Sequence, residues 1–352
     1  MRFTTAIILT IGVLFTFSGK AAAQNLPGDR MMEKYLAQET MKIANTFLAG
    51  IDSKEDWEKL RPKLKEEYFY MLGLWPLPEK KPLHATVTGT LERPTFKVEK
   101  LHFQSRPHLY VTGNLYLPRK IEGKLPAILY LCGHSGRGKN GNKTAYQHHG
   151  IWFANHGYVC LIIDTLMLGE IGEPMGAIHH GTYRYRRWWW HSKGYTPAGV
   201  ECWNGIRAID YLVSRPEVDP ERIGVTGISG GGASSFWIAA ADERVKAAVP
   251  VSGLSDLETQ VIDKVINGHC DCMFFYNTYL WPLTNIAALI APRAFLFANS
   301  DWDGIFPMPG NQRIRDRMER LYGLYGKAGR RGTFNICVAP GGHADKLELR
   351  LM

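Results

Sequence analysis

The sequence has no uninterrupted apolar run of 18 or more residues, so no segment resembles a full transmembrane helix. It also lacks blocks of consecutive lysine and arginine, internal repeats and low-complexity linkers, which argues against a nucleic-acid-binding tail and against disorder. Gly and Pro counts of 36 and 19 in 352 residues exclude a collagen-like chain. What remains is globular composition, with 45% hydrophobic and 21% charged residues.

The first 23 residues have the features of a secretory signal peptide. Arg2 provides a positive start, residues 6–17 form a 12-residue apolar run, and Ala21-Ala22-Ala23 provides a cleavage site. We expect cleavage after Ala23 and a secreted or periplasmic protein without stable membrane insertion; an uncleaved anchor is the alternative. Loss of Arg2 and Lys20 lowers the formal charge from +9 by two, to +7. This mildly basic chain suits an acidic polysaccharide or a negative cell surface and points to no nucleic acid.

The six cysteines are not spaced like a disulfide framework. Cys132, Cys160 and Cys337 lie in apolar, strand-like runs, where cysteine behaves as a small buried hydrophobe. Cys270 and Cys272 have a C-x-C spacing, shorter than the C-x₂₋₄-C of zinc sites, so we predict no metal. The sequence leaves open whether these two form a disulfide.

Hydrophobic periodicity divides the chain after residue 23 into a helical extension at 24–83 and a larger domain at 84–352. Helical spacing over residues 31–72 predicts two or three helices. Alternation over 84–118 predicts antiparallel strands, and nearly continuous apolar runs after residue 126 predict strands buried on both faces. These later strands are predicted at 127–132, 158–163, 222–226, 245–251, 294–298 and 334–338, with helices at 144–156, 199–214, 232–241, 285–291 and 310–326.

Strands that alternate with helices in this way predict an α/β fold with a doubly wound, mostly parallel sheet. Ligands bind such sheets at the carboxyl ends of the strands. Two segments, 166–198 and 254–284, follow strand ends and are longer than ordinary loops. We therefore expect both to act as lids or pocket walls over an active site.

A Gly-x-Ser-x-Gly motif lies between the strand predicted at 222–226 and the following helix. It reads Gly227-Ile228-Ser229-Gly230-Gly231. A serine in this strand-turn-helix context stands on a cramped turn that requires small neighbours, and the N–H of Gly230 points to where an oxyanion forms. Ser229 is therefore the predicted nucleophile; the alternative is an incidental serine at a glycine-rich helix entry.

A serine nucleophile needs a base, and in this context the chain order is Ser, then Asp or Glu, then His. His343 follows the strand predicted at 334–338, as that order requires of the base. His269 lies inside the insertion at 254–284 and is predicted to line the pocket.

Two acids follow the strand predicted at 294–298. The Asp-x-x-x-Pro spacing favours Asp303 as the partner of the base and makes Asp301 a turn residue. Earlier in the chain, Asp164 is predicted to form a turn, and Glu170 is a more remote candidate acid. The second oxyanion donor is expected from the turn after strand 127–132, where we predict the N–H of His134, with Ser135 as the alternative.

In this order, Cys132-Gly133-His134, the long insertion, GISGG, SDWDGIFP and GGH resemble the α/β-hydrolase superfamily over about residues 85–345. The chain is most similar to the branch of acetyl xylan esterases and cephalosporin deacetylase-like hydrolases. That resemblance implies a serine hydrolase without a cofactor, acting on an ester substrate such as an acylated poly- or oligosaccharide. Glucuronoyl esterases usually carry arginine after the nucleophile, where this chain has Gly230.

Two other functions fit the same residues. One is a serine peptidase of the prolyl-oligopeptidase-like group, although the N-terminal region is too short for a propeller. The other is a non-catalytic carbohydrate-binding relative. Only nine residues follow His343, where the superfamily has a further helix, so we expect a fragment or a truncated chain. No particular oligomeric state is indicated.

An unusual aromatic and basic stretch occupies residues 183–191, Tyr-Arg-Tyr-Arg-Arg-Trp-Trp-Trp-His. Trp188, Trp189 and Trp190 suit a sugar-stacking wall, and a lid folded down by its own tryptophans is the equal alternative. Neighbouring His179-His180 is expected to line the pocket. In the following helix, Trp203 is predicted to be core and Arg207 to lie on the surface or in an ion pair.

Overall fold

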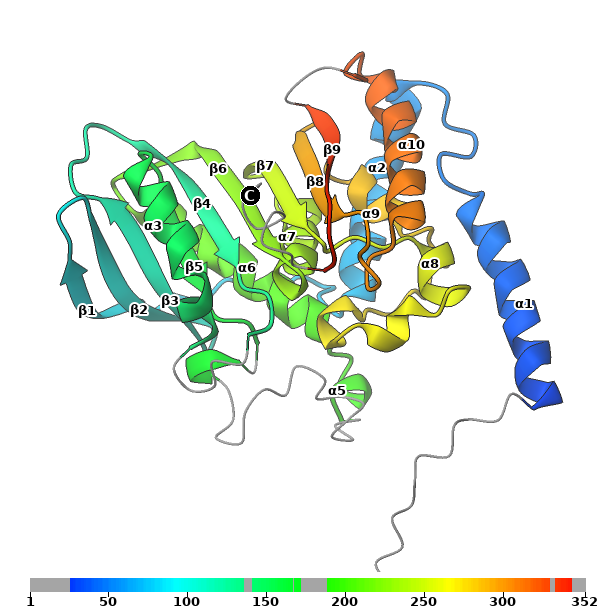
Figure 1. Ribbon diagram of the computed structural model, residues 1–352, viewed down its shortest axis with the longest axis horizontal. Coiled ribbons are helices and arrows are strands. Elements are labelled where there is room, and N and C mark those ends of the chain that lie inside the picture. The colour runs from blue at the N-terminus through cyan, green and yellow to red at the C-terminus, as the bar shows by residue number, and fades with distance from the viewer. Residues whose placement is uncertain (1–25, 136–140, 167, 172–188, 330–332, 344–352) are drawn as a thin grey trace, which may run out of the picture.

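The computed structural model describes residues 26–135, 141–166, 168–171, 189–329 and 333–343. The predicted signal peptide, His179-His180, Trp188 and the last nine residues lie outside the described residues. Nine strands in the described part form one sheet, in the order β1-β2-β3-β5-β4-β6-β7-β8-β9 (Figure 1). The strands are β1 (Thr86–Glu92), β2 (Phe96–Arg106), β3 (Leu109–Pro118), β4 (Leu125–Leu131), β5 (Val159–Ile163), β6 (Val218–Ile228), β7 (Val245–Val251), β8 (Ala294–Ser300) and β9 (Phe334–Ala339).

The kind of strand pairing changes once across the sheet, at β5. Strands β1, β2 and β3 pair antiparallel, as does β3 with β5. From β5 through β4, β6, β7 and β8 to β9, every pairing is parallel. The predicted change from alternating to continuous apolar runs is therefore confirmed, and all five residues of β5 are buried. The carboxyl ends of β4, β6, β8 and β9 consequently meet at one edge of the sheet.

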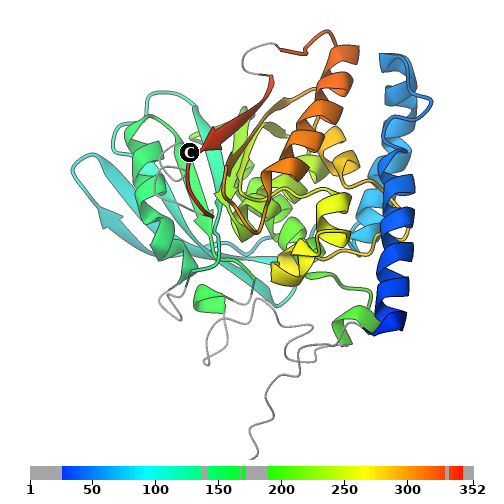
Figure 2. The ribbon, with the colours of Figure 1, turned by 45° about the vertical axis from the view of Figure 1, so that its right-hand side comes forward.

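Helices cover both faces of the sheet (Figures 1 and 2). Neighbours Leu129 and Tyr130 of β4 illustrate this, because successive strand side chains point to opposite faces. Leu129 belongs to the large core shared with α2, α6, α7, α9 and α10, and Tyr130 to a smaller cluster that includes Ala154 of α3. The helices are α1 (Pro27–Ala44), α2 (Lys54–Met71), α3 (Gln147–Asn155), α5 (Trp189–Ser192), α6 (Pro197–Ser214), α7 (Gly230–Ala241), α8 (Leu257–Val261), α9 (Thr284–Ala288) and α10 (Met308–Leu324), with 3₁₀ turns η2 (Asn142–Tyr146), η3 (Gly169–Ile171), η4 (Val265–Gly268) and η5 (Asp271–Met273).

The predicted N-terminal helices are α1 and α2. Helix α2 packs into the core: the hydroxyl of its buried Tyr68 donates to Trp237 O of α7 at 2.8 Å, and the two rings stack. Helix α1 lies at the edge of the molecule beside α8 (Figures 1 and 2). Within the described residues, no helix is both long and apolar enough to cross a membrane.

The two long segments contain short helices where the sequence predicted loops. Residues 254–284 hold α8, η4 and η5. Helix α8 begins at an N-cap, since the Asp256 side chain accepts a hydrogen bond from Thr259 N at 2.9 Å. Strand β6 begins at Val218, four residues before the prediction, because Val218 pairs with Leu125 of β4 across polar intervening positions.

Candidate active site

Ser229 lies on a strained turn between β6 and α7. Its φ of 58° and ψ of −121° place it in a region that residues with a side chain rarely adopt. The flanking glycines are required by space: a Cβ at Gly227 or Gly231 would lie 2.3 or 2.0 Å from the Leu131 carbonyl oxygen. The turn thus presses against the end of β4, and the serine side chain is held at the edge of the sheet.

Ser229, His343 and Asp303 form a continuous hydrogen-bonded series. His343 Nε2 lies 2.9 Å from Ser229 Oγ, and His343 Nδ1 lies 2.8 Å from Asp303 Oδ2. A carboxylate can only accept, so Nδ1 carries the ring proton and Nε2 accepts from the serine hydroxyl. The three residues come from the ends of β6, β9 and β8, and the structure brings them together as their order in the sequence predicts.

Asp303 is buried, and both of its carboxylate oxygens accept hydrogen bonds. Ile305 N and Phe306 N donate to its Oδ1 at 2.8 and 2.9 Å, and Ser252 Oγ donates to its Oδ2 at 2.8 Å. Burial acts to raise the pKa of Asp303, but hydrogen bonds and the nearby His343 outweigh it and lower the pKa below its ordinary value. Asp301 is exposed, and among the described residues its carboxylate accepts only from Gly341 N, at 2.9 Å, which is the predicted turn role.

The turn after β4 is held by a residue that the sequence analysis did not identify. The Asn142 side-chain oxygen accepts from Ser135 N at 2.8 Å, and its amide donates to Gly133 O at 2.6 Å and to Thr165 Oγ1 at 3.1 Å. The Ser135 N–H is therefore occupied, which leaves His134 as the oxyanion candidate of this turn. Asn142 carries no recognisable motif; only its position after the turn could have drawn attention to it.

Asp164 and Glu170 pair with Lys143 and not with His343 in the part of the chain that the structure describes. Both bind the buried ammonium group of Lys143, with Asp164 Oδ2 and Glu170 Oε2 as acceptors, the latter at 2.6 Å. Asp164 also accepts from Lys143 N and from Thr112 Oγ1, at 2.8 Å each. These contacts anchor η2 to the end of β5, so Asp164 is a structural residue and Glu170 is not a partner of His343.

A cavity of about 160 Å³ opens at Ser229. Its lining includes Gly230, His134 and the predicted pocket residue His269. His269 is buried, its Nε2 donates to Ile305 O at 2.7 Å, and its ring stacks on Phe306 with centroids 4.7 Å apart. Burial lowers the pKa of His269 below its ordinary value, so the ring is neutral near pH 7. His269 thus supports the loop that carries Asp303.

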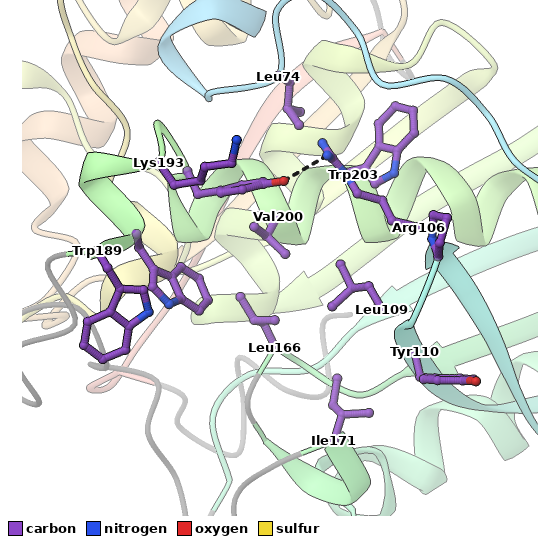
Figure 3. A pocket seen from close by; sticks show the side chains of 13 residues that line it. Leu74, Arg106, Leu109, Tyr110, Leu166, Ile171, Trp189, Lys193, Val200 and Trp203 are labelled. Carbon is purple, nitrogen blue, oxygen red and sulfur yellow. Dashed lines mark hydrogen bonds between the residues drawn. The ribbon is translucent and has the colours of Figure 1, made fainter.

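A larger cavity of about 650 Å³ lies between α5, α6 and the β2–β3 turn (Figure 3). Trp189 and Trp190 line it, and Trp189 lies at one end of the view, with Trp203 and Arg106 at the other. Trp189 is 62% exposed, so its ring is available to a ligand. Two of the three predicted platform residues therefore line a cavity.

Comparison with known proteins identifies the family. Residues 85–263, half of the chain, match the sequence profile of acetyl xylan esterase (AXE1). The chain belongs to the acetyl xylan esterase family. It is also similar to the *Bacillus subtilis* protein YtaP, which is named as a hydrolase, with 26% identity over 302 residues that cover 83% of this chain and 96% of YtaP.

Solved structures establish the fold of this esterase. It aligns with a structure named methylesterase BT1017 at a TM-score of 0.63 and 22% identity, over 89% of this chain and 64% of that one. It aligns with a *Bacteroides fragilis* structure named as an acetyl xylan esterase at a TM-score of 0.67 and 16% identity, over 90% and 82% of the two chains. The predicted α/β-hydrolase fold is confirmed.

The positively charged side chain of Arg106 lines the aromatic cavity of the esterase. The Arg106 guanidinium lies 5.4 and 5.8 Å from the ring centroids of Tyr195 and Trp203, and it donates to the Tyr195 hydroxyl at 3.0 Å (Figure 3). In the part of the chain that the structure describes, Arg106 forms no ion pair with a carboxylate.

Trp203 is buried, as predicted, and Arg207 is buried in an ion pair with Asp210, which corrects the surface alternative.

Beside Ser229, the esterase gathers four titratable side chains, of which Cys272 and Glu201 are buried and His134 and Cys270 are half-buried. The His134 ring, Cys270 and Cys272 lie together on the wall of the smaller cavity. The Glu201 carboxylate accepts a hydrogen bond from Ser234 Oγ, and burial raises the pKa of Glu201 to about 7, opposed by His134 and the hydrogen bonds. Sequence spacing could not reveal this group, because His134, Glu201 and the Cys270–Cys272 pair are more than 60 residues from one another.

Proposed function

We propose that this esterase removes small acyl groups from a poly- or oligosaccharide, with Ser229 as nucleophile, His343 as general base and acid, and Asp303 as the residue that orients the imidazole. The observation that carries the proposal is the hydrogen-bonded series from Asp303 through His343 to Ser229, with distances of 2.8 and 2.9 Å. It opens into a cavity, so a substrate can reach the serine.

The geometry supports a two-step acyl transfer. Ser229 Oγ attacks the ester carbonyl carbon while its proton moves to His343 Nε2, and His343 then gives that proton to the departing sugar alkoxide. In the second step His343 takes a proton from water, and the resulting hydroxide attacks the acyl carbonyl carbon. The bond to Ser229 Oγ then breaks, the acyl group leaves as a carboxylic acid, and His343 returns its proton to Ser229 Oγ. Asp303 holds Nδ1 protonated throughout and stabilises the imidazolium that forms.

The oxyanion that forms in each step requires donors beside Ser229. The N–H of Gly230 lies at the start of α7, where the helix dipole favours negative charge. The N–H of His134 is the proposed second donor, since Ser135 is bound to Asn142. One such donor typically lowers the barrier by about 2.7–4 kcal/mol.

The size of the cavity at Ser229 favours a short acyl group. Sites for drug-sized ligands enclose about 300–1,000 Å³, so about 160 Å³ suits an acetyl group better than a fatty acyl chain. The sugar part of the substrate is assigned to the aromatic cavity of about 650 Å³, where Trp189 and Trp190 offer stacking faces and Arg106 offers donors to hydroxyl or acidic groups.

The experiment compares acetate release from acetylated xylan with hydrolysis of p-nitrophenyl acetate, butyrate and octanoate, in the wild type and in Ser229→Ala. We expect xylan deacetylation, a preference for acetate over octanoate, and a loss of several orders of magnitude in Ser229→Ala, whose fold is set by the glycines. Octanoate preference contradicts the short-acyl assignment, and a fully active Ser229→Ala contradicts the mechanism.

We further propose that the protein is exported and cleaved after Ala23. The support is the positive start, the apolar run and the small residues before Gln24. N-terminal sequencing of the protein recovered outside the cytoplasm tests this. A sequence that begins at Gln24 supports export with cleavage, and one that begins at Met1 contradicts it.

A further inference from the structure

Three soft ligand atoms converge on the wall of the cavity at Ser229. His134 Nε2, Cys270 Sγ and Cys272 Sγ all lie within 4.8 Å of one another. His134 Nε2 is 3.7 Å from Cys270 Sγ, and the two sulfurs are 2.8 Å apart. The histidine comes from the turn after β4, and the cysteines come from the insertion after β7, so two distant segments of chain meet here.

The proposed acyl transfer does not use these side chains. It uses the backbone N–H of His134, whereas the imidazole Nε2 lies next to the Cys270 sulfur. The ring also lies close against Gly230, because a Cβ at that position would lie 2.6 Å from both its Cε1 and its Nε2. A fixed imidazole beside two sulfurs is a feature that ester hydrolysis alone leaves unexplained.

We propose that His134, Cys270 and Cys272 bind one thiophilic divalent ion, with zinc as the best match to this ligand set. Two thiolates and one imidazole are ligands that zinc prefers, and three protein ligands leave the fourth position for a water molecule from the cavity. The site was not predicted from the sequence, because the C-x-C spacing is shorter than usual and the third ligand is 136 residues from Cys270.

The distances are close to those of a bound ion. Zinc–sulfur bonds of about 2.3 Å and zinc–nitrogen bonds of about 2.0–2.1 Å in a tetrahedron separate sulfur from nitrogen by roughly 3.5 Å and sulfur from sulfur by roughly 3.8 Å. The His134–Cys270 separation of 3.7 Å already fits. The two sulfurs must move apart by about 1 Å, which rotation of the half-buried Cys270 side chain provides.

The site also has an acidic neighbour. The Glu201 carboxyl group interacts electrostatically with both His134 and Cys270, and it is fixed by the hydrogen bond from Ser234. A bound ion would fix the imidazole of His134 and, through it, the turn that carries the proposed oxyanion N–H. Ion binding itself does not depend on the proposed esterase mechanism.

The alternative chemistry for this pair is a disulfide. Two thiols lose two protons and two electrons when they join, and an organic disulfide or another thiol oxidant must accept the electrons. Such a bond requires no imidazole, whereas the structure places His134 within reach of the sulfur. The test therefore distinguishes the two chemistries directly.

The experiment titrates cobalt(II) into the reduced, chelator-treated full chain and into Ser229→Ala, and it measures zinc content in the protein as purified without an affinity tag. We expect one ion per chain in both proteins, with a thiolate-to-cobalt charge-transfer band and the intense d–d bands of tetrahedral cobalt. Because Ser229→Ala retains every ligand, its cobalt spectrum separates ion binding from failure of the esterase mechanism.

Cys272→Ser and Cys270→Ser each keep one thiolate, so each should weaken the charge-transfer band. Each should also bind cobalt at least about 10-fold to 100-fold more weakly, since changes in groups that merely orient a ligand already cost that much. Cys337→Ser, a cysteine of β9 outside the cavity lining, is the matched control and should bind like the wild type. Circular dichroism checks that each variant is folded. Either of two results overturns the site: folded Cys270→Ser that binds cobalt as tightly as the wild type, or purified wild type with no bound ion and a mass lower by two hydrogens.

Discussion

Replacement of Asp303 by asparagine tests the orientation of His343, the proposed general base. An asparagine at this position can still accept from Ile305 N and Phe306 N through its side-chain oxygen. Its amide NH₂ then faces His343 Nδ1 and must donate there. The imidazole is forced into the other tautomer, with the proton on Nε2, where it cannot accept the proton of Ser229.

The expected loss follows from that tautomer. In the serine protease that the triad mechanism is known from, the same replacement lowers kcat by about 10⁴-fold with the geometry intact, and we expect a loss of this order in kcat for p-nitrophenyl acetate. Asp301→Asn is the matched control. Its carboxylate is exposed and accepts from Gly341 N in the turn, so turnover should change by less than about threefold.

Stability provides a second readout of the same replacement. Folding lowers the pKa of Asp303 below the ordinary value of 3.8, so the folded state favours the carboxylate. The stability that this charge contributes is therefore fully present above about pH 4 and is lost as the pH falls through the lowered pKa. The difference in urea midpoint between wild type and Asp303→Asn should shrink below pH 4. Equal kinetic effects of Asp301→Asn and Asp303→Asn, or the reverse order, would refute the reasoning.

Three other changes give separate tests. Trp189→Ala should lower kcat/KM on acetylated xylan about fivefold, because stacking contributes about 1 kcal/mol, and should leave kcat/KM on p-nitrophenyl acetate unchanged. Replacement of the exposed Trp152 of α3 by alanine is the control. A parallel loss on both substrates, together with a lower melting temperature, ends the platform hypothesis. Asn142→Ala should lower the unfolding free energy by about 1–3 kcal/mol and kcat about tenfold, because Ser135 N and Gly133 O lose their partner; unchanged kcat contradicts its role. Burial raises the pKa of Glu201 from 4.5 to about 7, so the folded state of the chelator-treated protein holds a proton that the unfolded state loses. The free energy of unfolding should therefore fall by on the order of 3 kcal/mol as the pH rises between these values. Glu201→Gln should abolish this decline, and urea midpoints that stay parallel in the two proteins from pH 4.5 to 8 contradict it.

Most of the fold follows from local patterns. Continuous apolar runs such as β5 and alternating runs such as β2 are set by whether one or both faces are buried, and periodicity reports that directly. The chain order of Ser229, Asp303 and His343 also predicted that these residues lie together, since each follows a strand and the parallel strand ends meet at one edge. The Gly227 and Gly231 spacing had a steric origin that the sequence context already implied.

The remaining features depend on contacts between distant segments. The convergence of His134 with Cys270 and the bonds from Asn142 to the turn at Gly133 arise only after the sheet has assembled. Burial of Arg207 was missed because its partner Lys81 O comes from the segment before β1. No periodicity within a single element carries such information.

The most direct test of the central claim is to trap the acyl-enzyme. The esterase is mixed with p-nitrophenyl acetate, quenched with acid within one turnover, and digested for peptide mass mapping. Our account predicts a burst of one p-nitrophenolate per chain and an acetyl group on Ser229, absent from Ser229→Ala. An acetyl group on another residue, or a burst that persists in Ser229→Ala, would contradict it.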